Sequence, residues 1–264
     1  MKFTKMHGLG NDYVYINTMA EKVEHPGQLA RTLSERHTGI GADGLILIGG
    51  SQTADFSMDI YNADGSRGEM CGNGIRCVAK YVYDKQLTKK TQIAIETLSG
   101  VKYVHLKLAG EQVEVNMGKP WFAVQKTPLK VEEHTYSVTR VSMGNPHAVL
   151  FVEDTEYFPV ARLGPLIETH ELFPNRVNTE FCQILDRETI RMRVWERGSG
   201  ETQACGTGAC AAAVAAVLND LTEPAVTIKL LGGDLFVKWD RWQNRVFMTG
   251  PAVTVFDGEL MMDL

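Results

Sequence analysis

Hydrophobic and polar residues alternate in short runs along most of the chain, and only a few segments have helical spacing. The runs Gln92 to Glu96, Tyr103 to Leu108 and Val113 to Met117 are typical of strands with one buried face. Pro26 to His37 and Val160 to Glu171 carry apolar residues at helical spacing. The pattern predicts an α+β fold in which strands outnumber helices.

Two more helices are predicted, each directly after a Cys-Gly-x-Gly turn. The helix after Cys71 has one apolar face, formed by Ile75, Val78, Ala79, Val82 and Tyr83. The stretch from Ala209 to Leu218, after Cys205, is apolar on nearly every side. Such a helix must be surrounded by other elements, so we expect a sheet to wrap around it.

The two Cys-Gly-x-Gly turns indicate an internal duplication. Their separation is 205 − 71 = 134 residues, and composition alone predicts roughly 0.05 copies of this motif. Gly10-Asn11 recurs as Gly144-Asn145 at the same offset. We therefore predict two pseudo-symmetric domains, 1–118 and 119–264, with the C-terminal tail able to pack back on the first. Each would be a mixed sheet wrapped around a central helix, with the active site in the interdomain cleft.

Composition narrows the possible partners. The net charge is −5 and there is no basic run, which argues against nucleic acid. The N-terminus lacks the apolar core of a signal peptide, and Ala204 to Leu218 is too short and glycine-interrupted to span a membrane. We expect a cytoplasmic protein with reduced cysteines. Gly39 to Gly44 loosely resembles a nucleotide-binding fingerprint, but it opens a strand, so we interpret it as a loop.

The five cysteines do not have zinc-ligand spacing, so we expect no metal site. A cysteine at a helix start sits at the positive end of the helix dipole, which should lower the pKa of its thiol. The backbone amides that follow each cysteine form an anion site, and they belong to Gly72, Asn73, Gly206 and Thr207. Two such sites facing each other could remove a proton from one side of an α-carbon and return one to the other side. Two core cysteines, or a redox pair, are the alternatives.

The chain resembles the diaminopimelate epimerase family at these motifs. The resemblance is carried by Met70 to Cys77, by Gly198 to Gly208, by the opening Lys5 to Asp12 and by Met143 to His147. It implies interconversion of LL- and meso-diaminopimelate without pyridoxal phosphate or metal, in lysine and peptidoglycan-precursor synthesis. It also implies a homodimer.

The resemblance assigns roles to individual residues. Cys71 and Cys205 would be the acid/base pair, and His147 and Glu196 would assist. The substrate contacts implied are Asn11, Asn62, Gly72, Asn73, Asn145, Asn178, Glu196, Arg197, Gly206 and Thr207. Some relatives carry a side-chain amide where this chain has Gly44, so we assign no substrate contact to Gly44.

Two other functions remain open. A proline or hydroxyproline racemase would share both cysteines, but a cyclic imino acid needs no second polar cage with Arg197. A non-catalytic amino-acid-binding protein would not require a thiol on each face of its ligand. Asn145 could also be a simple turn residue, His147 a packed histidine, and Glu196 an exposed charge at a strand end.

Overall fold

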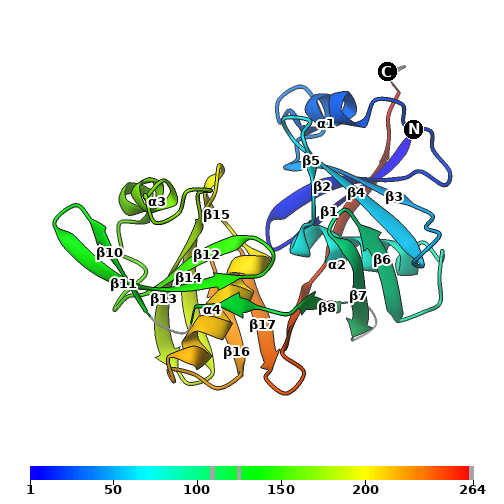
Figure 1. Ribbon diagram of the computed structural model, residues 1–264. Helices are drawn as coiled ribbons and strands as arrows, with labels where there is room; N and C mark the ends of the chain where they lie inside the picture. Colours follow the sequence, from blue (N-terminus) through cyan, green and yellow to red (C-terminus); the bar gives the residue numbers. More distant parts are fainter. Residues whose placement is uncertain (108–110, 124–125, 262–264) are drawn as a thin grey trace. The chain divides into compact units, whose positions relative to one another are not determined.

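The computed structural model describes residues 1–107, 111–123 and 126–261 (Figure 1). They form two compact units: Met1–Val115 together with the segment from Gly250 onward, and Asn116–Thr249. Each unit is a mixed sheet with one helix against it on either side, as the alternating pattern predicts. The domains predicted at 1–118 and 119–264 stay a prediction, because a compact unit need not fold independently.

The first unit is a continuous sheet around α2. Its strands pair in the order β19, β1, β2, β3, β4, β6, β7, β8, with parallel pairing only between β2 and β3 and between β4 and β6. The bounds are β1 (Lys2–Gly8), β2 (Asn11–Asn17), β3 (Gly44–Gly49), β4 (Phe56–Asn62), β5 (Arg67–Gly68), β6 (Gln92–Thr97), β7 (Gly100–Lys107), β8 (Gln112–Gly118) and β19 (Val253–Glu259). In Figure 1 the red C-terminal strand β19 runs beside the blue β1. The predicted Tyr103 to Leu108 strand is β7, and Leu108 lies outside the described residues.

The helix α2 (Gly72–Asp84) is enclosed by the sheet of its own unit. It contacts β1, β2 and β7, while α1 (Pro26–Ser34) covers β3 and β4. The predicted apolar face of α2 is buried except for Tyr83, which is half-buried. Arg76, Cys77 and Tyr81 on the other sides are buried as well. The helix is thus covered more completely than its amphipathic pattern indicated.

The second unit repeats this arrangement. Its strands pair in the order β10, β11, β12, β13, β14, β16, β17, β18, and β9 adds to β11. The bounds are β9 (Trp121–Phe122), β10 (Thr127–Val131), β11 (His134–Ser142), β12 (Pro146–Phe151), β13 (Asn178–Asp186), β14 (Thr189–Glu196), β15 (Gly200–Thr202), β16 (Ala225–Leu230), β17 (Gly233–Asp240) and β18 (Arg245–Pro251). The helix α4 (Gly206–Leu218) contacts β11 to β14 and β16 to β17, and α3 (Val160–Glu168) covers β13 and β14.

The offset seen in the sequence recurs in the elements. The helices α1 and α3 begin 160 − 26 = 134 residues apart, and α2 and α4 begin 206 − 72 = 134 residues apart. The parallel pairs also correspond, β2–β3 with β12–β13 and β4–β6 with β14–β16. The prediction of two pseudo-symmetric α+β units with central helices is confirmed. The nearly all-apolar α4 is buried from Gly208 to Ala216, as a surrounded helix must be.

Candidate active site

Each central helix begins directly after a cysteine. Cys71 is the N-cap of α2, with extended backbone angles of φ −132° and ψ 118°, and its Sγ accepts a hydrogen bond from the Gly74 N–H at 3.3 Å. Cys205 caps α4 in the same way, with φ −119° and ψ 112°, and its Sγ accepts from the Gly208 N–H at 3.3 Å. Both sulfurs therefore lie over a first helical turn, where N–H groups lack helical acceptors.

The last glycine of each motif permits close packing of the helix start. A Cβ at Gly74 would lie 2.6 Å from Cδ1 of Ile46, and one at Gly208 would lie 2.7 Å from Oε1 of Glu180. Real Cβ atoms do not approach other heavy atoms so closely, so a larger residue would push the helix start off the adjacent strand. The Cys-Gly-x-Gly spacing is thus set by packing as well as by chemistry.

The Cys71 site consists of Asn11, Tyr13, Asp43, Cys71, Asn73 and Arg76. The Cys71 thiol donates to Oδ1 of Asn11 at 3.3 Å, and Nδ2 of Asn73 donates to the same oxygen at 3.3 Å. The hydroxyl of Tyr13, two residues along β2 from Asn11, interacts with Cys71 as well. Of the residues expected here, Asn11, Gly72 and Asn73 lie at the cysteine.

Asn62 lies at the exposed end of β4. Its amide donates to Oγ of Ser66 at 3.0 Å, within the turn that leads to β5. Asn62 pairs with Gly44 in the β3–β4 ladder. A Cβ at Gly44 would lie 2.9 Å from Cε1 of Tyr13, so the missing side chain at position 44 makes room for the Tyr13 ring.

The Cys205 site consists of Asn145, His147, Glu180, Glu196, Cys205 and Thr207. Its Sγ lies 3.5 Å from Oγ1 of Thr207, which accepts from Nδ2 of Asn145 at 3.2 Å. Oδ1 of Asn145 lies 3.1 Å from Nε2 of His147. The structure thus brings together Asn145, His147 and Thr207 beside the second cysteine, as the motifs predict.

Glu196 closes the other side of the Cys205 site. It accepts a short hydrogen bond from Oγ1 of Thr202 and interacts with Cys205. Burial raises the pKa of the Glu196 carboxyl, and its bonds to Thr202 and Cys205 offset part of that rise. A carboxyl with a raised pKa beside a thiol is suited to share a proton with it.

Asn178 and Arg197 lie next to one another at the end of the β13–β14 ladder. Asn178 donates to the Pro146 carbonyl at 3.0 Å and accepts from the Arg197 N–H at 2.9 Å, so its amide is already held by backbone. The Arg197 side chain is exposed, and its Nη1 donates to the Asn175 carbonyl at 3.2 Å. A guanidinium placed in this way can still grip a carboxylate with its remaining N–H groups.

The expected lowering of the thiol pKa is wrong for both cysteines in this structure. Burial raises the pKa of the Cys71 thiol, and the Gly74 N–H, Tyr13 and the Arg76 charge offset only part of it. The pKa of Cys205 is raised further, by burial and then by the carboxylates of Glu196 and Glu180. Desolvation outweighs the helix dipole here, because each sulfur is covered by its own sheet.

Four residues of these sites were missed by sequence reasoning: Tyr13, Asp43, Arg76 and Glu180. Tyr13 shared a strand face with Asn11, and an acid at position 180 interrupts an otherwise apolar run. The internal repeat offered a further signal, because Glu180 matches Ile46 and His147 matches Tyr13 at the offset of 134. Polar residues on one half opposite apolar or aromatic ones on the other mark where the two sites differ.

Comparison with known proteins decides the family. The model of the family described as diaminopimelate epimerase matches residues 3–123 and 139–255. The chain belongs to the diaminopimelate epimerase family. A member from Methanococcus maripaludis is 50% identical, with 98% of this chain and 99% of the relative covered. Another from Acetivibrio thermocellus is 51% identical, with 98% of each chain covered.

Solved structures place the fold of this diaminopimelate epimerase family member among related proteins. It resembles a phenazine biosynthesis protein of the PhzF family from Bacillus anthracis, with a TM-score of 0.76, 16% identity and 99% coverage of both chains. It also resembles a probable proline racemase from Agrobacterium radiobacter, with a TM-score of 0.76, 14% identity, and 99% and 93% coverage. At such identities the likeness shows the fold alone.

Membership of the family makes the chain an isomerase of a small-molecule amino acid. Among the residues that the structure describes, no helix is long and apolar enough to cross a membrane.

Proposed function

We propose that the protein interconverts LL- and meso-2,6-diaminopimelate by proton transfer between Cys71 and Cys205, for lysine and peptidoglycan-precursor synthesis in the cytoplasm. The observation that carries the proposal is the same N-cap geometry at both cysteines in a chain about half identical to diaminopimelate epimerases. Such a pair needs neither pyridoxal phosphate nor a metal ion, because the two sulfurs supply both the acid and the base.

The proposed step begins with one cysteine as thiolate and the other as thiol. The thiolate removes the α-proton, the electron pair of the C–H bond passes into the adjacent carboxylate, and the thiol delivers its proton to the opposite face. The first amides of α2 and α4, from Gly72, Asn73, Gly206 and Thr207, would stabilise the negative charge on that carboxylate. At the end of the step the two sulfurs have exchanged protonation states.

The remaining contacts follow from the second amino-acid end of the substrate. We assign Asn11, Asn62, Asn145, Asn178 and Glu196 to polar contacts with substrate and Arg197 to the distal carboxylate. His147 and Glu196 would assist proton transfer at Cys205. A cage of this kind would reject proline, because its polar groups would be left unpaired.

We also propose that the protein is a homodimer. The strand β19 supports this, since Val253, Val255 and Phe256 are 41%, 53% and 46% exposed along one outer strand. Apolar side chains gathered in this way favour an interface. Light scattering on Val255→Asp should show a lower mass than the wild type, and an unchanged dimer would exclude this strand as the contact.

Exchange of the α-proton into deuterated water tests the reaction. With LL-diaminopimelate as substrate, Cys71→Ala and Cys205→Ala should each lose inversion by at least roughly 10²-fold, the contribution of one positioned acid or base. Cys182→Ala, a buried cysteine on β13, is the matched control and should keep turnover. Full inversion by either N-cap variant, or equal turnover of proline, would refute the proposal.

A further inference from the structure

The side-chain amide of Asn11 has different partners at its two ends. Its Nδ2 donates to Oδ2 of Asp43 at 2.8 Å. Its Oδ1 accepts from the Cys71 thiol and from Nδ2 of Asn73, both at 3.3 Å. Asn11 therefore presents an acceptor, not a donor, to the sulfur.

These contacts belong to a chain of hydrogen bonds with a single direction. Nη2 of Arg76 donates to Oδ1 of Asn73 at 2.9 Å, Asn73 donates to Asn11, and Asn11 donates to Asp43. A guanidinium can only donate and a carboxylate can only accept. Rotating either amide by half a turn would bring two donors or two acceptors together, so the two charged ends determine both orientations.

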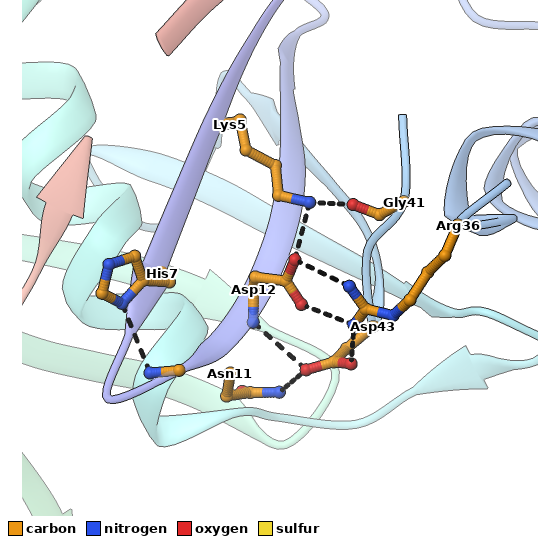
Figure 2. A network of polar contacts seen from close by, with 8 residues as sticks. Lys5, His7, Asn11, Asp12, Arg36, Gly41 and Asp43 are labelled. Atoms are coloured by element: carbon orange, nitrogen blue, oxygen red, sulfur yellow. Dashed lines mark hydrogen bonds and ion pairs between the residues drawn. The ribbon is translucent and has the colours of Figure 1, made fainter. Parts of the chain in front are cut away.

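Asp43 is held independently of Asn11, as Figure 2 shows. Its Oδ1 accepts from Nη2 of Arg36 at 2.9 Å, its Oδ2 accepts from the Asp12 N–H at 3.1 Å, and its own N–H donates to the Asp12 carbonyl at 2.8 Å. Asp12 is fixed in turn by the buried Lys5 at 2.6 Å. The carboxylate thus stays in place whatever Asn11 does, which makes it an anchor.

We infer that Asp43, in the loop that opens β3, is a positioning residue that turns the Asn11 carbonyl oxygen toward Cys71 and so holds this cysteine in its protonated form. An acceptor at 3.3 Å is satisfied by a thiol and repelled by a thiolate. The protonated form is the one that delivers a proton in the proposed reaction, and in this respect the inference rests on the proposed function.

The other groups around Cys71 do not supply this bias. The titratable or charged side chains that interact with it in the described residues are Tyr13 and Tyr15 on β2 and Arg76 and Cys77 on α2. Arg76 favours the thiolate, and the Tyr13 hydroxyl also lowers the pKa of the thiol. Asn11 is the neighbour whose orientation opposes them.

The test is the pH dependence of Cys71 alkylation by iodoacetamide, followed by mass spectrometry of the peptide that contains it. Asp43→Ala removes the acceptor for Asn11, whereas Asp43→Asn removes the charge but keeps an oxygen there. Asp12→Asn is the matched control, because it removes a charge from the same network without a side-chain contact to Asn11. Cys205, in the other unit, is the internal standard in every sample.

We expect Asp43→Ala to raise the alkylation rate of Cys71 below its midpoint by roughly 2- to 10-fold over Asp43→Asn, the range of one net hydrogen bond. Asp43→Asn should match Asp12→Asn. Equal profiles for Asp43→Ala and Asp43→Asn would overturn the inference, since charge alone would then explain any change. If Asp43→Ala unfolds, seen as reaction of the buried Cys77 and Cys182, Asp43→Ser takes its place. Alkylation needs no turnover, so the result stands apart from the fate of the proposed function.

Discussion

The Nδ1 atom of His147 lies 2.6 Å from Oε1 of Glu180, and neither side chain is accessible to solvent. The pair fixes the plane of the imidazole ring, whose Nε2 faces Asn145. Asn145 in turn donates to Thr207 at the start of α4. The second Glu180 oxygen has no hydrogen-bond partner in the described part of the chain, which leaves a buried negative charge near Cys205.

Glu180→Gln should therefore change Cys205 in two ways. Loss of the charge removes one cause of the raised Cys205 pKa, so alkylation of Cys205 should become faster at a given pH. Turnover should fall by roughly tenfold or more, because His147 loses a charged hydrogen-bond partner. Stopped alkylation with mass spectrometry and the deuterium-exchange assay measure the two effects.

Thr179→Ser, a neighbouring buried change on β13, is the control for packing at position 180. It should leave the reactivity of Cys205 as in the wild type. Slower alkylation in Glu180→Gln would contradict the assignment of the charge.

The free protein should show high midpoints for thiol ionisation at both N-cap cysteines. A thiol is neutral below its pKa, so a raised pKa means less thiolate at neutral pH and alkylation that accelerates on going to alkaline pH. Cys205 should titrate at higher pH than Cys71, because two carboxylates add to burial there. Cys77, whose pKa burial raises to about 11, should react last of these three in a folded sample.

This order can be read from iodoacetamide rates between pH 7 and 10 at each peptide. Cys205 reacting at lower pH than Cys71 would show that the carboxylates of Glu196 and Glu180 are protonated or displaced in solution.

Arg197→Ala should weaken substrate binding without loosening the fold. The side chain is exposed, and a charged hydrogen bond contributes about 1.5–3 kcal/mol, so kcat/KM should fall roughly 10- to 100-fold, mainly through KM. The thermal midpoint should stay within about 1 °C of the wild type, as for other surface changes.

Arg191→Ala is the matched control, since Arg191 is an exposed arginine on the same strand, β14. It should leave KM unchanged. A fall in kcat alone for Arg197→Ala would argue against a grip on the distal carboxylate.

Gly44→Ala should damage the Cys71 site through packing. The new methyl group would lie 2.9 Å from the Tyr13 ring and still closer to the Tyr61 carbonyl, and overpacking of this kind costs about 1–3 kcal/mol. Gly50→Ala, whose Cβ would meet no atom within 4 Å, is the control. Chemical denaturation should separate the two, and equal stability would mean that the strand shifts freely at position 44.

The sequence was sufficient for the architecture because the duplication is recorded at one constant offset. Helix starts at Pro26 and Val160, and at Gly72 and Gly206, follow from local patterns that packing reinforces. The cysteines and the residues beside them, Asn11 and Asn145, were found because they belong to contiguous motifs.

The rest depended on contacts between segments distant in the chain. Asp43 reaches Asn11 across a parallel strand pair, and Glu180 reaches His147 across another, so no local pattern marks either contact. The direction of the thiol pKa shifts was missed for the same reason. A helix start is visible in sequence, but the depth at which the sheet buries Cys71 and Cys205 is not.

The pairing of β19 with β1 has a consequence for biosynthesis. The second unit is continuous in sequence, from Asn116 to Thr249, whereas the first needs a strand that leaves the ribosome after it. We expect the second unit to be complete while the N-terminal strand β1 still waits for its outer neighbour. Shortening the chain before Val253 should therefore expose the edge of β1 and favour aggregation, even though every residue proposed for catalysis would still be present.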